Sequence, residues 1–220
     1  MTTELQKRII TSIFLFFLIT VMYLYSFAMI VFLIIIAIII WVEFYALISK
    51  IKKKNSLIDK SYKFLFKILS LLYLLSLVSL IFYIEGYHPD LKVYLLYSTL
   101  VSILSDIGGL AFGKFFKGKK LTKISPNKTI SGSIGSFLFS MSLIPFFWGE
   151  MINHNFIILI IITILISLTS QLGDLFISYI KRKAKVKNTS DILPGHGGFL
   201  DRVDGMIFAI PLGFFLFNIF

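Results

Sequence analysis

The chain alternates long apolar runs with short polar segments. Seven runs of about 20 residues lie at roughly 9–25, 27–48, 64–84, 93–112, 132–149, 155–180 and 199–219. A helix of about 20 residues crosses about 30 Å of hydrocarbon and satisfies its own backbone hydrogen bonds in lipid. The alternating ten-residue segments typical of a membrane barrel do not occur. The pattern predicts an all-α, polytopic integral membrane bundle of about seven transmembrane helices.

Basic residues concentrate in alternate loops of this map. The loops between the basic ones hold only Lys92. Because Lys and Arg mark cytoplasmic loops, this asymmetry predicts a cytoplasmic N-terminus and an outer C-terminus. The basic segments are 7–8, 50–63, 114–128 and 181–187.

Composition narrows the class further. Hydrophobic residues make up 57% of the 220 residues, against about 45–50% in soluble domains. The net charge of +11 would favour nucleic acid in a soluble protein, but in a membrane chain it serves topology and anionic headgroups. The absence of Cys excludes disulfides, thiolate metal sites and thiol nucleophiles.

Charge is unusually dense in the segment 173–205. It holds four Asp, six Lys or Arg and one His, between two apolar runs. Pro194 to Gly198 predicts a turn whose bare backbone can approach a ligand closely. Carboxylates beside cations and a Gly-rich loop are typical of a Mg²⁺–phosphate site. The segment therefore indicates phosphoryl or nucleotidyl transfer between a water-soluble and a lipid substrate.

Three other features are candidates for chemistry. The loop 124–129 joins a Ser-Pro turn, a Lys and two hydroxyls before a glycine-bearing helix start, a combination that suits phosphate without being a P-loop. Asp106 and Glu43 lie within apolar runs, where an acid is a functional candidate by default. Glu43 could instead pair with Lys50 or reach the membrane surface.

The residues of the charged segment resemble the signature of a known enzyme family. Ser178, Lys181-Arg182, Lys187 and the run 193–204, LPGHGGFLDRVD, are similar to the signature of phosphatidate cytidylyltransferases. Gly173-Asp174-Leu175, Asp106, Gly113 and the segment 124–129 resemble further parts of its pattern. The resemblance covers about residues 100–210. It implies that CTP and phosphatidate give CDP-diacylglycerol and pyrophosphate, without a protein nucleophile.

The resemblance also implies roles for individual residues, with Mg²⁺ as cofactor. It implies catalytic roles for Asp174, Lys181, Arg182, His196, Asp201 and Arg202. It implies substrate contacts from Ser125, Lys128, Thr129, Ser178, Lys187, Gly197 and Gly198. It implies metal ligation by Asp174, Asp201 and Asp204. It further implies a homodimer in the bacterial inner membrane, with the site facing the cytoplasm and no nucleic-acid partner.

We expect N-terminal transmembrane helices over 1–92 and a catalytic transmembrane region with two cytoplasmic motif loops over 93–220. The chain departs from the family pattern at Leu110, Ile130, Ser131, Ile177 and Asn188. The alternatives are a CTP-dependent lipid kinase, a catalytically weakened lipid-binding member of the family, and an ion transporter using its intramembrane acids.

Overall fold

The computed structural model describes residues 3–51, 57–122, 124–151 and 155–220. Some basic residues behind the topology prediction lie outside this description. They are Lys52, Lys53, Lys54 and Lys123, together with the side chains of Lys7 and Arg8.

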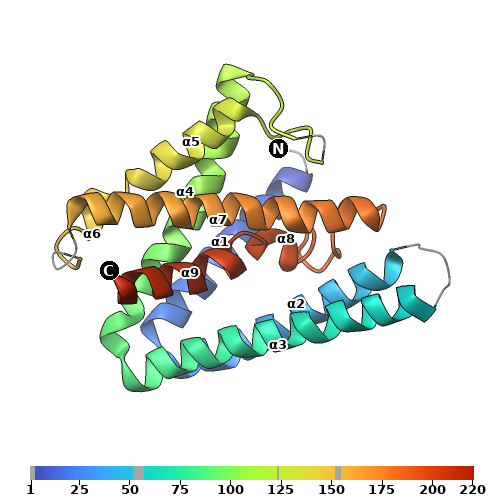
Figure 1. Ribbon diagram of the computed structural model, residues 1–220, viewed down its shortest axis with the longest axis horizontal. Helices are drawn as coiled ribbons and strands as arrows, with labels where there is room; N and C mark the ends of the chain where they lie inside the picture. Colours follow the sequence, from blue (N-terminus) through green and yellow to red (C-terminus); the bar gives the residue numbers. More distant parts are fainter. Residues whose placement is uncertain (1–2, 52–56, 123, 152–154) are drawn as a thin grey trace. The chain divides into compact units, whose positions relative to one another are not determined.

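Helices make up nearly all the regular structure of the described residues, which contain isolated β-bridges but no strand (Figure 1). The all-α prediction is confirmed. The helices are α1 (Thr3–Leu24), α2 (Ser26–Lys50), α3 (Leu57–Tyr87), η1 (Pro89–Leu91), α4 (Lys92–Phe116), α5 (Ile130–Met141), α6 (Ile144–Phe147), α7 (Phe156–Lys183), α8 (Leu200–Val203) and α9 (Met206–Ile219).

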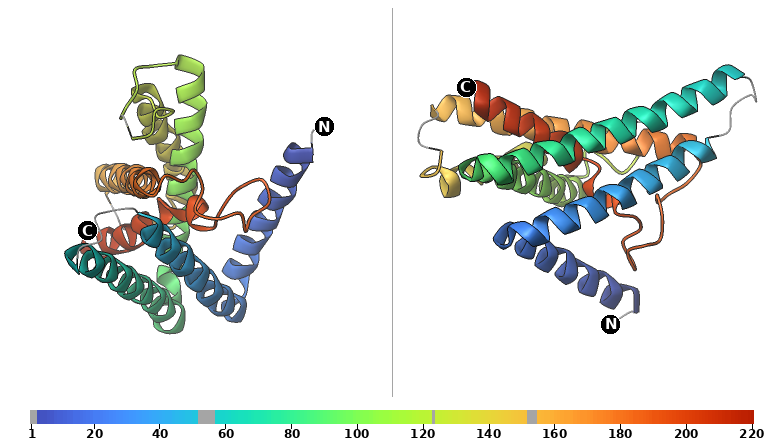
Figure 2. Two further views of the ribbon diagram at one scale, coloured as in Figure 1. Left: turned by 90° about the vertical axis from the view of Figure 1, so that its right-hand side faces the viewer. Right: turned by 90° about the horizontal axis from the view of Figure 1, so that it is seen from below.

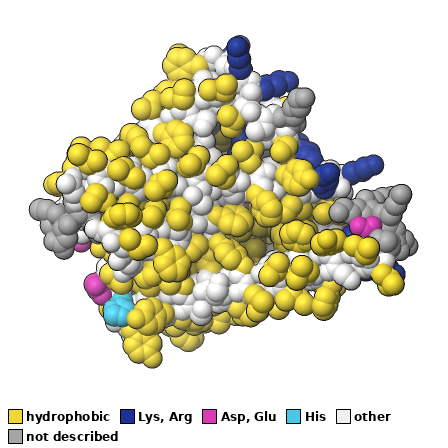
Figure 3. Space-filling view, in the orientation of Figure 1, with side chains coloured by type: hydrophobic (Ala, Val, Ile, Leu, Met, Phe, Trp, Pro, Cys, Tyr) yellow, Lys and Arg dark blue, Asp and Glu magenta, His cyan; other side chains and the backbone are white. Residues whose placement is uncertain are grey.

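Six helical segments among the described residues are long and apolar enough to cross a membrane. They correspond to the second through seventh predicted runs. The first predicted run is the shorter apolar helix Ile9–Leu24. Large hydrophobic side chains such as Phe16, Phe27 and Phe146 are exposed, and hydrophobic groups cover most of the face seen in Figure 3. Such surfaces suit lipid contact, so the chain is a multi-pass membrane protein.

The chain divides into two compact units. The first consists of residues 1–87 and 180–203. In it, Tyr25 is the single extended residue between α1 and α2, and α2 packs against both α1 and α3 (Figure 2). The short helix α8 also contacts α2. The segment 180–203 therefore belongs with the N-terminal helices, although more than 90 residues separate them in the chain.

The second unit consists of residues 88–179 and 204–220. Its apolar core includes the fully buried Tyr97, Val101 and Ile166. Helices α4 and α5 approach closely because Gly108 lies against the Gly135 carbonyl, where a side chain would not fit. Small residues at a helix contact allow this approach in membrane proteins.

Buried hydroxyls join α4 to α7 within this unit. The Tyr97 and Thr163 hydroxyl oxygens lie 2.6 Å apart, as do those of Ser102 and Ser170. Hydrogen bonds of this kind between helices satisfy polar groups that have no water to bind. The expected division into N-terminal helices over 1–92 and a catalytic region over 93–220 stays a prediction.

Candidate active site

The segment 180–203 leaves α7 at Lys183 and returns through a tight turn. The Leu193 amide donates to the Gly197 carbonyl at 2.8 Å, and the Gly197 amide donates back to Leu193 at 3.1 Å. Gly195 and Gly197 have φ of 74° and 86°, values that favour glycine. A Cβ at Gly197 would lie 3.0 Å from Asp201 Oδ2. The predicted turn is confirmed, and it brings bare backbone against a carboxylate.

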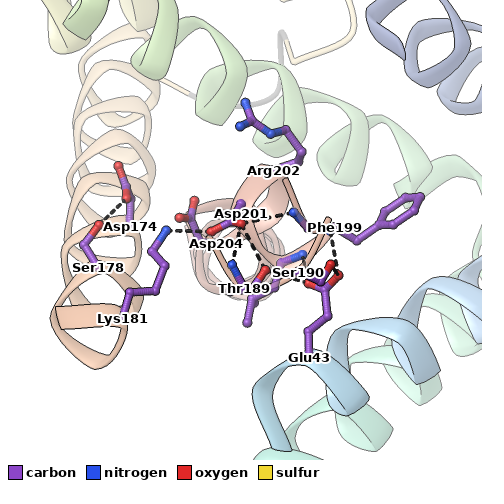
Figure 4. A network of polar contacts seen from close by, with 12 residues as sticks. Glu43, Asp174, Ser178, Lys181, Thr189, Ser190, Phe199, Asp201, Arg202 and Asp204 are labelled. Carbon is purple, nitrogen blue, oxygen red and sulfur yellow. Dashed lines mark hydrogen bonds and ion pairs between the residues drawn. The ribbon is translucent and has the colours of Figure 1, made fainter. Parts of the chain in front are cut away.

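The Asp201 carboxylate makes several of the polar contacts of this segment. Its Oδ1 lies 2.7 Å from the Lys181 ammonium, and the two side chains are only 6% and 11% exposed. Its Oδ2 accepts from the Thr189 amide at 2.8 Å and the Gly198 amide at 3.1 Å, and the Thr189 hydroxyl oxygen lies 3.0 Å from it (Figure 4). A buried carboxylate requires such donors. The predicted site residues Lys181 and Gly198 therefore both contact the predicted site residue Asp201.

The Arg202 side chain contacts the backbone of His196. Arg202 Nη2 and Nε donate to the His196 carbonyl at 2.7 and 3.2 Å. The His196 ring Nε2 lies 3.5 Å from the Ser12 hydroxyl on α1. The Thr11 hydroxyl beside it donates to the Pro194 carbonyl at 2.9 Å. Arg202 thus stabilises the turn by bonding its backbone. Residues of α1 contact the same turn.

Arg182 and Lys187 are exposed cations on the same segment. An exposed Lys or Arg side chain can approach an anionic ligand without first losing a buried partner. Their predicted role as phosphate contacts stays a prediction.

The second unit holds the other predicted residues near the end of α7. Lys128 forms an ion pair with Asp174, and the Ser178 hydroxyl donates to Asp174 Oδ1 at 3.2 Å. Asp174 and Ser178 are four residues apart on α7, a spacing that places them on one face of the helix. Three predicted residues from two motifs, Lys128, Asp174 and Ser178, are therefore adjacent.

The loop before α5 is built by its own hydroxyls. Thr129 is the N-cap of α5 and accepts from the Gly132 amide at 3.0 Å. The Ser125 carbonyl accepts from the Lys128 amide at 3.0 Å, which closes the Ser-Pro turn. A hollow lined by Lys120, Leu121, Thr122 and Pro126 opens beside it. The cap explains Thr129 locally and leaves its predicted substrate contact untested.

Asp204 and Asp106 differ in their exposure to solvent. Asp204 is buried, and its Oδ1 accepts from the next backbone amide, of Gly205, at 3.0 Å. Asp106 is exposed on α4.

The carboxylate of Asp201 has the chemistry of a ligand that a divalent cation would share with a substrate. Among the described residues, no group of three or more His, Asp or Glu side chains is gathered as metal ligands. Mg²⁺ commonly takes one or two carboxylates and completes its shell with phosphate and water oxygens. Asp201 Oδ1 accepts one hydrogen bond from the described residues, which leaves it a lone pair for a cation. Shared ligation by Asp174, Asp201 and Asp204 stays a prediction.

Glu43 belongs to this site, although the sequence did not indicate its partners. Glu43 of α2 is 3% exposed and contacts the segment 189–200 (Figure 4). Its position in an apolar run marked it as a candidate, but nothing in the sequence identified its partners. The alternative pairing with Lys50 is not what the structure shows.

Comparison with known proteins gives the family. The chain is 44% identical over 122 residues to a Staphylococcus haemolyticus protein named phosphatidate cytidylyltransferase, covering 54% of this chain and 46% of that protein. A Rickettsia bellii protein of the same name is 41% identical over 149 residues, covering 63% of each. The chain thus spans about half to two thirds of the length of these relatives. The model of the cytidylyltransferase family matches residues 2–220, so the chain belongs to the cytidylyltransferase family.

Proposed function

We propose that this chain transfers the cytidylyl group of CTP to phosphatidate, giving CDP-diacylglycerol and pyrophosphate. The observation that carries the proposal is the family match over residues 2–220, with the signature residues Lys181 and Gly198 both in contact with Asp201. The names of the relatives describe the same reaction. No observation favours the lipid kinase, the lipid-binding role or the transporter.

The chemistry needs positioning more than a protein nucleophile. A phosphate oxygen of phosphatidate forms a bond to the α-phosphorus of CTP, and the bond to the β-phosphate breaks to release pyrophosphate. Basic side chains, among them Arg182 and Lys187, bind the phosphates and offset the charge that develops. A bound Mg²⁺ would stabilise charge on the phosphate oxygens. Asp174, Asp201 and Asp204 are the residues proposed to hold it.

The membrane setting follows from the same proposal. A phospholipid substrate and a nucleotide meet at the lipid–water boundary, where charged segments follow apolar helices. The basic segments support a cytoplasmic active site in the bacterial inner membrane. A homodimer, expected from the resemblance, is proposed as the functional assembly.

A product assay tests the function. The purified protein in detergent receives phosphatidate, Mg²⁺ and CTP labelled at the α-phosphate, and the label is followed into the lipid phase. A parallel reaction uses CTP labelled at the γ-phosphate, which would label the lipid only if the enzyme were a kinase. We expect the α-label in lipid and the γ-label in pyrophosphate. Chelation of the metal should abolish both the labelling of lipid and the release of pyrophosphate.

Matched variants assign the site. Asp201→Asn should lower turnover at least ~100-fold, in the range of a lost charge-stabilising group. Asp191→Asn changes an exposed acid of the same segment and should retain turnover. Absence of α-label in lipid from folded wild-type protein would refute the proposed function.

A further inference from the structure

Glu43 is a buried acid in an unusual place. It lies on α2, the most hydropathic of the candidate spans, and is only 3% exposed. An acid in such a helix is costly to bury unless donors surround it. The donors it finds come from residues about 150 positions later in the chain.

Its two carboxylate oxygens accept four hydrogen bonds. Oε1 accepts from the Ser190 hydroxyl at 2.6 Å and the Phe199 amide at 3.1 Å. Oε2 accepts from the Thr189 hydroxyl at 2.9 Å and the Leu200 amide at 2.8 Å. The carboxylate therefore binds both ends of the loop 189–200, which contains the Gly-rich turn, and fixes their separation.

Thr189 extends the contact to Asp201. Its hydroxyl lies 2.9 Å from Glu43 Oε2 and 3.0 Å from Asp201 Oδ2 (Figure 4). A hydroxyl has one proton, so it donates to one carboxylate at a time. The other two donors to Asp201 Oδ2, the amides of Thr189 and Gly198, lie within the segment that Glu43 holds.

Gly198 shows how closely the parts fit. A Cβ at this position would overlap the Thr189 hydroxyl and approach the Glu43 oxygens to 2.5 and 2.7 Å. Only glycine fits without displacing the carboxylate or the hydroxyl. The glycine, the hydroxyl and the two acids therefore form one packed arrangement.

We propose that Glu43 is a positioning residue: its carboxylate orients Asp201 by holding Thr189 and the 199–200 backbone. The effect on turnover rests on the proposed function. A carboxylate is required because each oxygen faces two donors, one of them a backbone amide. Glutamine would present an NH₂ group to one of those amides, which cannot turn round to accept from it.

The test combines Glu43→Gln with a matched control, Glu150→Gln, which changes an exposed glutamate. Turnover is measured per folded molecule on the monodisperse fraction. We expect kcat of Glu43→Gln to fall at least ~10-fold, as for a lost charge-assisted hydrogen bond, and that of Glu150→Gln to stay at the wild-type value. Thr189→Val should lower kcat, and Thr189→Ser, which keeps the hydroxyl, should restore most of it.

A second readout is independent of activity. The chain has no Cys, so Ile192→Cys places a single nitroxide label on an exposed residue of the loop. Its electron paramagnetic resonance spectrum should show restricted motion in the wild-type background. In Glu43→Gln the label should become more mobile, and in Glu150→Gln it should not.

These experiments distinguish a failure of the Glu43 proposal from a failure of the proposed function. Wild-type kcat and label mobility in Glu43→Gln would overturn the proposal, as would a mobile loop with unchanged kcat. If Glu43→Gln does not fold, Thr189→Val decides, and normal turnover there would overturn the link to Asp201. If wild-type protein shows no cytidylyl transfer, the proposed function fails, while the spin label still decides whether Glu43 holds the loop.

Discussion

Lys181 and Asp201 are twenty residues apart in the chain, yet the ammonium and Oδ1 are 2.7 Å apart in the structure. Lys181 comes from the last turns of α7 and Asp201 from α8, so the pair closes the whole charged loop between them. Both side chains are nearly buried. Removing one partner of such a pair leaves an uncompensated charge, whereas removing both does not.

A double-mutant cycle on this pair should therefore be far from additive. Lys181→Met should destabilise the protein by about 3 kcal/mol, and combining it with Asp201→Asn should add much less than the single changes predict. The coupling should exceed about 1 kcal/mol. Heat-induced loss of the monodisperse peak in detergent measures it. Additive effects would show that the contact contributes nothing specific.

The pair Lys128–Asp174 should behave differently. These side chains are 26% and 23% exposed, so water screens this ion pair more than the Lys181–Asp201 pair, and we expect it to contribute only about 1 kcal/mol. Lys128→Gln should leave thermal stability nearly unchanged. If Lys128 also contacts substrate, kcat/KM for CTP should still fall by about 100-fold.

The control for this prediction is Lys119→Gln, an exposed Lys of the same loop. It should retain both stability and kcat/KM. Equal losses of kcat/KM in the two variants would indicate a general effect of loop charge in place of a specific contact.

Gly198→Ala should damage the site severely. The added methyl overlaps the Thr189 hydroxyl, and forcing extra volume into a packed position costs about 1–3 kcal/mol. We expect a loss of stability in that range and a loss of turnover. Gly86→Ala is the matched change, because nothing lies within 4 Å of its Cβ. It should be neutral or stabilising by up to about 1 kcal/mol. A benign Gly198→Ala variant would contradict the close fit.

The α4–α5 contact gives a prediction about folding alone. Gly135→Ala places a methyl group against Phe112 and the Gly108 carbonyl, so the two helices must separate. We expect a lower melting temperature with kcat per folded molecule retained, while Gly149→Ala, where the Cβ meets open space, should leave both unchanged. Thermal unfolding in detergent beside the product assay checks both halves. Unchanged melting in Gly135→Ala would mean that the contact tolerates a side chain.

The sequence by itself determined the helices and the local chemistry. Apolar runs of membrane length predicted the spans because lipid offers no partner for backbone groups. The turn at Pro194 to Gly198 follows from a short stretch, where the Pro and Gly residues limit the possible backbone geometry. The four-residue spacing of Asp174 and Ser178 likewise puts them on one face of a helix, where the Ser178 hydroxyl donates to Asp174.

Only the tertiary structure decided which distant residues complete the site. Glu43 and Thr189 are 146 residues apart, and no periodicity links a helix residue to a loop so far along the chain. Thr11 and Ser12 contact the turn from α1 for the same reason. Such partners are chosen by packing: a buried carboxylate must find donors wherever the fold places them.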